Sequence, residues 1–241
     1  ICAYHRTHHE RACACLEAGK HVIIEKPLGI TMKACRLIVE TARNNDRILA
    51  VAENYRRSPG QRAINWALKK GMIGEPRMLF YIDVGENLGP WGWRDKKDIA
   101  GAGWLLDGGV HYADMFRYHL GEAWEVTAVM KSYDQFRYRN SQEKKDPVLA
   151  TVEDSAFALI KFENDVIVQW TSVRAAPGKG FNSHVIYGTE GSIDYGANLC
   201  LRGKEPQNVN EMFQESLTDE EREKLFPLSL IHISEPTRPL Y

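Results

Sequence analysis

The sequence predicts an α/β fold, in which a parallel sheet covered by helices is followed by an α+β part with a largely antiparallel or mixed sheet. Three observations support this prediction. Residues 1–58 alternate helical and strand patterns at the spacing of a parallel sheet. The residues that follow show longer strands joined by turns. The chain has 241 residues, 44% of them hydrophobic, which is enough for a sizeable core.

Residues 1–58 contain the elements of the expected parallel sheet. In order, they are a helix over His8–Ala18, a strand over Val22–Glu25, a helix with Ala34, Leu37, Ile38 and Ala42 on one face, and a strand over Ile48–Ala52. Thr7 and Glu10 form a capping box before the first helix, and Gly19 suits its left-handed C-cap. Thr31 is the expected N-cap of the second helix.

The second part begins near Ser58, where we place a domain boundary. Its expected elements are a helix over Gln61–Lys70, a strand over Arg77–Val84, a helix within Leu105–Leu120, and strands over Trp124–Met130, Ala156–Phe162 and Val166–Trp170. The last two strands are separated by residues 163–165, whose composition predicts a hairpin turn. Residues 132–147 are dense in charged residues and tyrosine, and we interpret them as a solvated loop or excursion between strands.

Charge and hydropathy argue against two classes of partner. The chain has 31 Lys and Arg against 32 Asp and Glu, so no strong global field attracts nucleic acid or an anionic membrane. The apolar runs are far shorter than the roughly 20 residues of a transmembrane helix. The five cysteines include no CxxC pair, which favours a reducing compartment, and we expect a cytoplasmic protein.

Both ends of the chain suggest an internal fragment of a longer protein. Ile1–Ala3 is interpreted as the end of a strand, so this start carries no information about an export signal. Leu228–Tyr241 has neither strand alternation nor a helical period, and it resembles a translated adapter sequence. The expected units are therefore 1–58, 59–227 and an artefactual tail over 228–241.

The first candidate site is Glu25, Lys26 and Pro27, at the carboxyl end of a predicted parallel strand. Ligands of open α/β sheets bind outside these strand ends. The Lys26 ammonium could stabilise the alkoxide that forms when a substrate hydroxyl loses its proton. The alternative is an exposed lysine with no special role.

The second candidate is the segment 107–114, which predicts the opening of a helix. Asp107 is expected at or near the N-cap, and His111, four residues later, on the same face. The positive end of the helix dipole disfavours imidazolium, so His111 is expected to accept a proton near neutral pH. The alternative is that Asp107 is a cap and His111 a packed histidine.

A metal site is the less favoured interpretation of the same residue types. Two groups contain suitable ligands, namely Asp107, His111 and Asp114, and His8, His9 and Glu10. Neither group has the i, i+4 histidine pair of a helical zinc site, so we expect no metal.

An aromatic loop precedes the second candidate. Trp91, Trp93 and Arg94 lie in a stretch rich in glycine and proline. An indole can stack on the apolar side of a sugar while a guanidinium bonds its hydroxyls, so we assign these residues to substrate binding. The alternative is that the indoles cover the core.

Three motifs, in the same order along the chain, resemble the Gfo/Idh/MocA oxidoreductases, the family of glucose-fructose oxidoreductase and inositol dehydrogenase. Residues 16–27 are similar to the family's EAGKHV..EKP stretch, residues 107–114 match its DxGxHxxD, and residues 188–191 resemble its GTEG turn. The resemblance covers residues 1 to about 200. It implies that residues 1–58 are the C-terminal part of a Rossmann-type dinucleotide-binding domain whose first βαβ unit, with the Gly-rich fingerprint, is absent.

The resemblance also implies an activity, which is hydride transfer between NAD or NADP and a secondary alcohol or ketone of a sugar, cyclitol or related polyol. Lys26, Asp107 and His111 would be catalytic, with His111 as the acid/base and Asp107 orienting it or the substrate. Cofactor contacts would come from residues 25–27, His8, Asn54 and Arg56. Family members often form homo-oligomers through the C-terminal sheet.

Two other functions fit the same architecture. One is a non-catalytic ligand sensor, against which the presence of Lys26, Asp107 and His111 together argues. The other is an NAD-dependent glycosidase, which would release a sugar without net change of the cofactor. One departure from the family lies at residues 3–8, where of the TPNHxH stretch only the last histidine, His8, is present.

Overall fold

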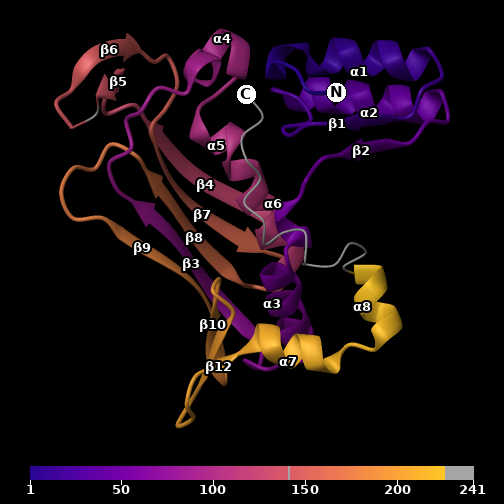
Figure 1. Ribbon diagram of the computed structural model, residues 1–241, viewed down its shortest axis with the longest axis vertical. Coiled ribbons are helices and arrows are strands. Elements are labelled where there is room, and N and C mark those ends of the chain that lie inside the picture. The colour runs from indigo at the N-terminus through magenta and orange to yellow at the C-terminus, as the bar shows by residue number, and fades with distance from the viewer. Residues whose placement is uncertain (141, 226–241) are drawn as a thin grey trace.

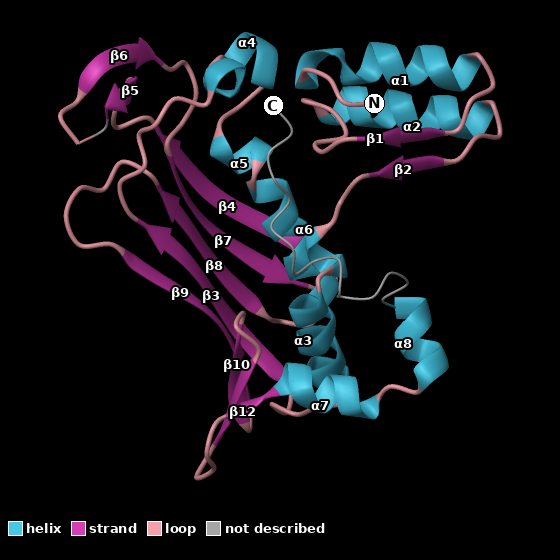
Figure 2. Cartoon of the chain, viewed as in Figure 1, coloured by secondary structure: helices cyan, strands magenta, loops and turns pink. Residues whose placement is uncertain are grey.

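The computed structural model describes residues 1–140 and 142–225 (Figure 1). The predicted tail over 228–241 lies outside these residues. The fold is α/β, as predicted, with a small parallel sheet followed by a large mixed sheet. Figure 2 shows the two sheets in separate regions of the molecule, connected through the chain that follows β2.

The N-terminal part confirms the predicted parallel sheet. Strands β1 (Val22–Ile24) and β2 (Leu49–Val51) pair in parallel. Helices α1 (His8–Glu17) and α2 (Met32–Asn44) supply Leu16 and Ile38 to a cluster with Ile24, and all three side chains are fully buried. This cluster is separate from the core of the large sheet.

The predicted helix ends at Thr31 and Gly19 are present, whereas the predicted cap at Thr7 is not. The Thr31 hydroxyl accepts a hydrogen bond from Ala34 N at 3.1 Å, and Gly19 has a φ of +74°, both as expected. Thr7 does not cap α1, because the short 3-10 helix η1 (His5–Thr7) runs directly into it and the Thr7 hydroxyl donates to Tyr4 O instead. Leu37 is exposed, since the buried face of α2 is formed by residues 38, 41 and 42.

The large sheet has eight strands in the order β12-β11-β10-β9-β3-β8-β7-β4. Their bounds are Pro76–Val84 (β3), Ala123–Lys131 (β4), Ser155–Phe162 (β7), Ile167–Val173 (β8), Phe181–Gly188 (β9), Gly191–Asp194 (β10), Asn198–Leu201 (β11) and Gln207–Asn208 (β12). Strand β3 is central, parallel to β8 and antiparallel to β9. The sheet is therefore mixed, as predicted.

Helices cover one face of this sheet (Figure 2). They are α3 (Pro59–Lys69), α6 (Gly109–Leu120) and α7 (Val209–Ser216), followed in the chain by α8 (Asp219–Leu225). The core lies between them and the sheet, where Phe116 of α6 packs edge-on against Tyr81 of β3 and Trp170 of β8. The expected hairpin between β7 and β8 is present, and its Asp165 has a φ of +64°.

Residues 132–147 are not a plain loop but an excursion, the alternative interpretation, and most of their described residues are exposed. The segment contributes to a hairpin of β5 (Phe136–Asn140) and β6 (Lys145–Leu149). Arg137 at its base is buried and lies 3.5 Å from the buried carboxylate of Asp95. The charged composition suggested full solvation, but one of these charges is paired inside the structure and anchors the hairpin.

Candidate active site

Lys26 joins the two parts of the chain. It lies just beyond β1, at the carboxyl end of the parallel sheet. Its Nζ donates a hydrogen bond to the backbone O of Asp107 at 2.6 Å and lies 3.4 Å from Asp107 Oδ1. The structure therefore brings together two of the three residues expected to be catalytic, although 81 positions separate them.

Asp107 is a buried carboxylate surrounded by cationic and imidazole groups. Besides Lys26, Arg94 Nε donates to its Oδ1 at 3.0 Å, and His5 Nε2 lies 3.3 Å from the same oxygen. Burial alone would raise the pKa of Asp107, but the His5 contact and the charges of Lys26 and Arg94 hold it well below its usual value. Asp107 is thus a fixed anion that orders the cations around it.

The helix expected to begin near Asp107 is divided into two. Asp107 closes the short helix α5 (Trp104–Asp107), and Gly108 separates it from α6. A Cβ at Gly108 would lie 2.6 Å from the Trp104 ring, so a larger residue would have to displace this indole. The Glu153 carboxylate holds the start of α5 by accepting from Gly103 N and Leu105 N.

His111 lies in the first turns of α6, as predicted, but its partner was not. Its Nδ1 is 2.7 Å and 2.8 Å from the two carboxylate oxygens of Glu53. The Tyr55 ring stacks on the imidazole, with 3.9 Å between centroids and 5° between planes. A carboxylate on Nδ1 keeps the proton there and leaves Nε2 as the proton acceptor.

The structure places the aromatic loop residues in two different surroundings. Trp93 packs edge-on against His5, with ring centroids 4.7 Å apart, and Arg94 stacks over Trp93 while it bonds Asp107. Trp91 lies apart from this cluster and packs against Trp104. Trp93 and Arg94 therefore adjoin Lys26, whereas Trp91 belongs to a neighbouring cavity.

Of three further residues expected at the cofactor, His8 and Arg56 have partners of their own and Asn54 borders a separate cavity. The ring nitrogens of His8 lie 2.8 Å and 3.2 Å from the carbonyl oxygens of Pro27 and Ala3, and burial lowers the pKa of His8. Arg56 forms a two-pronged ion pair with Asp114. Asn54 borders a cavity of about 440 Å³ between Tyr55 and the large sheet. Among the described residues, none of these three side chains contacts Lys26 or Asp107 directly.

Sequence reasoning missed His5 and Glu53, and it placed Tyr55 with Asn54 and Arg56 near the nicotinamide without foreseeing its stacking on His111. Glu53 follows β2 and thus lies at the carboxyl end of the second parallel strand, so the rule that singled out Lys26 would have found it as well. His5 and Tyr55 lie in the 3-10 helices η1 and η2 (Tyr55–Arg57), which have no periodic signal to mark them.

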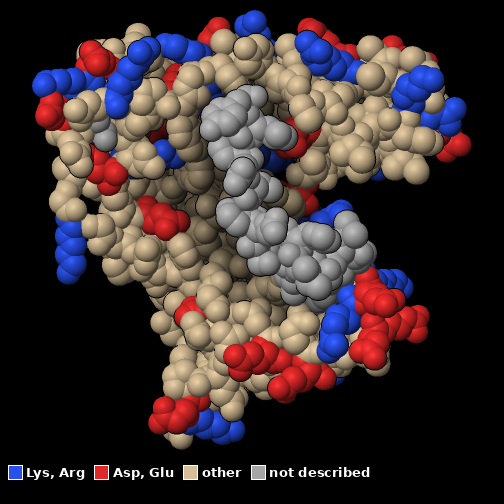
Figure 3. All heavy atoms as spheres, in the orientation of Figure 1, with Lys and Arg blue, Asp and Glu red and all other residues tan. Residues whose placement is uncertain are grey.

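A cavity of about 510 Å³ opens beside Lys26. It is lined by residues from both parts of the chain: Cys2, Ala3, Tyr4, His5, Arg11, Glu25, Lys26, Trp93 and Arg94. Figure 3 shows a hollow between the N-terminal part and the large sheet on the face that it draws. In ranges 1–140 and 142–225, no three His, Cys, Asp or Glu residues are grouped closely enough to hold a metal ion. No helix of the described chain is long and apolar enough to cross a membrane.

Comparison with known proteins identifies the fold and its family. A model of the oxidoreductase family's NAD-binding Rossmann fold matches residues 1–53, and one of the GFO/IDH/MocA C-terminal domain matches residues 62–194. The chain belongs to the Gfo/Idh/MocA family. The predicted family and the Rossmann-type character of the N-terminal part are thereby confirmed.

Characterised Gfo/Idh/MocA members resemble the chain over about half of their own length. Levoglucosan dehydrogenase of Pseudarthrobacter phenanthrenivorans is 33% identical over 77% of this chain and 52% of its own. D-glucoside 3-dehydrogenase of Escherichia coli is 30% identical over 70% of this chain and 49% of its own. A solved levoglucosan dehydrogenase in complex with NADH and levoglucosan superposes with a TM-score of 0.70 at 29% identity, covering 84% of this chain and 56% of that structure.

Proposed function

We propose that this protein is an NAD- or NADP-dependent oxidoreductase acting on a secondary alcohol or ketone of a sugar, cyclitol or related polyol. The contact between Lys26 and Asp107 is the observation that carries the proposal. It joins the carboxyl end of a Rossmann-type sheet to the helix pair that bears His111. Related proteins named as dehydrogenases of levoglucosan, D-glucosides and inositol support the substrate class.

Each of the three catalytic candidates has a distinct task in this proposal. His111 Nε2 takes the hydroxyl proton, since Glu53 holds the proton on Nδ1. The Lys26 ammonium stabilises the negative charge that develops on the substrate oxygen. Asp107 keeps Lys26 and Arg94 in place, and its own low pKa keeps it charged while they act.

The residues beside Lys26 fit a nicotinamide cofactor. A bound nicotinamide would accept or donate the hydride. The 510 Å³ cavity lies at the strand ends where dinucleotides bind in this fold, and it presents the Glu25 carboxylate and the Lys26 ammonium, which suit ribose hydroxyls. Pro27, Asn54 and Arg56, the last held by Asp114, complete the proposed cofactor contacts, whereas His8 would support them by bracing the backbone at Pro27.

Substrate contacts are proposed for Trp93 and Arg94 beside Asp107, with Trp91 farther out.

We also propose that the chain divides near Ser58 into two units. Two separate buried clusters support that division. A cytoplasmic location remains part of the proposal.

The proposal extends to a homo-oligomer that forms through the large sheet. Its outer face carries an apolar stripe on strands that lie in register: Met78, Val129, Phe157, Leu159, Ile167 and Tyr187. The described helices lie on the opposite face (Figure 2). A second copy would bury this stripe, which is unusual for the surface of a monomer.

Basic and acidic side chains are interspersed over the visible face in Figure 3, and nucleic acid is not a proposed partner.

Hydride transfer tests the function. The full-length protein, given NAD or NADP and a panel of polyols, should reduce the cofactor, and His111→Ala should lower turnover about 100-fold or more with cofactor affinity nearly intact. The matched control is His9→Ala, on α1. Cofactor binding without hydride transfer would indicate a sensor, and sugar release without a net cofactor change would indicate a glycosidase. Wild-type turnover in His111→Ala would remove the proposed role of His111.

A further inference from the structure

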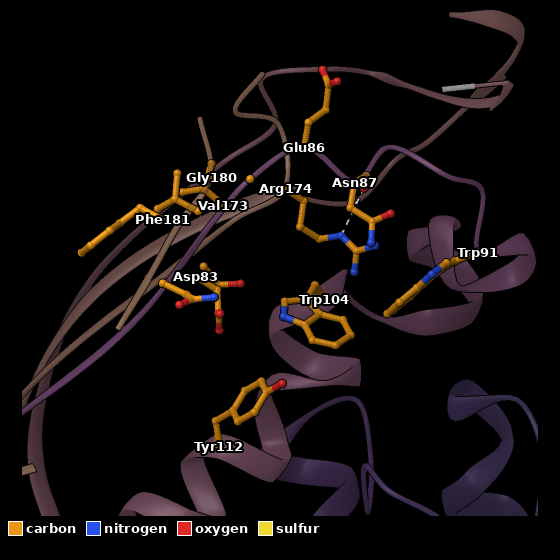
Figure 4. A pocket seen from close by; sticks show the side chains of 14 residues that line it. Asp83, Glu86, Asn87, Trp91, Trp104, Tyr112, Val173, Arg174, Gly180 and Phe181 are labelled. Carbon is orange, nitrogen blue, oxygen red and sulfur yellow. Dashed lines mark hydrogen bonds between the residues drawn. The ribbon is translucent and has the colours of Figure 1, made fainter. Parts of the chain in front are cut away.

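A third cavity, of about 530 Å³, lies between the large sheet and the α5–α6 pair (Figure 4). Its walls come from β3, β8 and β9, the loop after β3, and helices α5 and α6. Lys26, Asp107 and His111 do not line it. Its volume lies within the roughly 300–1,000 Å³ of small-molecule sites.

The sheet side of this cavity is a row of polar side chains. Ser172, Asp83 and Asn182 lie side by side in the register of β8, β3 and β9. The next row on this face holds Trp170 and Tyr81, which pack against α6. His184 of β9 lies in the same row and its Nε2 is 3.0 Å from Asp83 Oδ1, so an aromatic row gives way to a polar row in which Asp83 is already paired through one of its two carboxylate oxygens.

The opposite side consists of indoles and a guanidinium. Arg174 lies over the Trp91 and Trp104 rings, 4.3 Å and 5.0 Å from their centroids, and its Nε donates to Asn87 O at 3.3 Å. No carboxylate of the described residues lies within ion-pair distance of Arg174, and burial lowers the pKa of its guanidinium. Its terminal nitrogens are thus available to a ligand. Figure 4 shows Asp83 across the cavity from Trp104, with the Glu86 carboxylate turned away.

The cavity adjoins the proposed reaction centre through two short connections. Trp104 begins α5, whose last residue is Asp107, and Tyr112 follows His111 in α6. Trp104 and Tyr112 line the cavity, whereas Asp107 and His111 face Lys26 and Glu53. Tyr112 also lines the 440 Å³ cavity that Tyr55 borders, and Tyr55 stacks on His111, so an elongated molecule could extend from the reaction centre past Tyr112 into this cavity.

We propose that this cavity is a subsite for a second sugar unit, linked through a glycosidic bond to the ring that reacts at Lys26 and His111. Aromatic walls, a guanidinium on one side and a carboxylate with an amide on the other suit a pyranose, whose apolar face stacks and whose hydroxyls both donate and accept. The inference rests on the proposed function and assigns it a substrate class, that of disaccharides and extended glycosides.

The test compares matched substrates in the full-length protein. Pairs such as methyl α-glucoside with maltose and methyl β-glucoside with cellobiose are assayed for kcat/KM. We expect the wild type to favour a disaccharide of at least one pair. Asp83→Asn should reduce that preference about tenfold, the loss for a hydrogen bond to a charged group, and Asn182→Ala about fivefold, the loss for a neutral one. The matched control Asp98→Asn changes an exposed carboxylate outside the cavity and should leave the preference unchanged.

Three outcomes would overturn the inference. The first is a wild type that prefers no disaccharide. The second is an equal loss of kcat/KM on both members of a pair, which would place the reacting ring in the cavity. The third is an unchanged preference in both cavity variants. If no sugar is oxidised, the proposed function fails, and binding then tests the subsite separately. Maltose or cellobiose should quench the tryptophan fluorescence of the wild type at concentrations about tenfold lower than in Asp83→Asn. The absence of such quenching would overturn the subsite as well.

Discussion

Asp107 connects the two halves of the proposed site at the scale of single residues. Its Oδ1 lies within 3.4 Å of Lys26, Arg94 and His5, which come from three separate segments of the chain. A buried carboxylate is stabilised only when its charge is compensated, and here the compensating groups are themselves the catalytic and substrate-binding candidates. Asp107 therefore couples the folding of this region to the geometry of the site.

Glu53 is predicted to be a positioning residue that acts through His111. Glu53→Gln keeps the shape but loses the carboxylate that selects the Nδ1 tautomer, so kcat should fall about tenfold or more while KM stays near the wild-type value. The measurement is kcat and KM across pH, because a merely structural residue would not move the pH profile. Glu53→Asp should restore part of kcat. An unchanged profile in Glu53→Gln would contradict this role.

Lys26 is predicted to set the pH at which oxidation reaches its plateau. Its ammonium favours the deprotonated form of the substrate oxygen, so Lys26→Ala should lower turnover and move the plateau of the oxidation rate to higher pH. The pH dependence of kcat for alcohol oxidation measures this effect. Lys20→Ala, in the turn before β1, is the matched control. If Lys26→Ala keeps the wild-type profile, Lys26 is an ordinary strand-end lysine.

At the scale of elements, the packing of α6 on α3 depends on a neutral histidine. His119 of α6 contacts Gln61 of α3 at 2.8 Å through Nε2, and burial lowers the pKa of His119 from 6.5 to about 3. The unfolded chain therefore takes up a proton near pH 6.5 that the folded chain does not accept until about pH 3. Between these values the free energy of unfolding should fall by about 1.4 kcal/mol per pH unit as pH decreases.

The prediction for His119 is tested by urea unfolding at pH 7 and pH 5. The wild type should lose about 2 kcal/mol between these values through this residue alone. His119→Gln should show a correspondingly smaller loss, although it lowers stability at pH 7. His9→Gln, on α1, is the control. An equal pH dependence in the wild type and in His119→Gln would show that His119 does not titrate on unfolding.

The sequence predicted elements best where a local signal marked them. Gly19 and Thr31 delimit helices through their own backbone conformation and side chain, and the β7–β8 hairpin is marked by turn residues. The β5–β6 hairpin was missed because its anchor is the contact of Arg137 with Asp95, 42 positions away. The break between α5 and α6 at Gly108 was also missed, and there the Trp104 ring lies so close that a Cβ on residue 108 would meet it at 2.6 Å.

At the scale of the whole molecule, the uncovered face of the large sheet predicts self-association. Leu159 lies in the middle of the apolar stripe and is 53% exposed, so Leu159→Glu should cost the monomer little stability. It should shift the protein from an oligomer to a monomer at concentrations where the wild type is associated. Sedimentation velocity measures this shift, and Glu220→Gln on α8 is the control. A wild type that is monomeric at all concentrations would end the proposal of a homo-oligomer.

The sequence by itself determined the family, the α/β class and the candidates Lys26, Asp107 and His111, because motifs, caps and apolar periodicity are encoded in neighbouring residues. Only the tertiary structure decided that Lys26 and Asp107 meet, that Glu53 and Tyr55 hold His111, and that Ser172, Asp83 and Asn182 form one row. These contacts join residues far apart in the chain. Strand register and helix packing fix such distances, and neither leaves a mark on the sequence around a single residue.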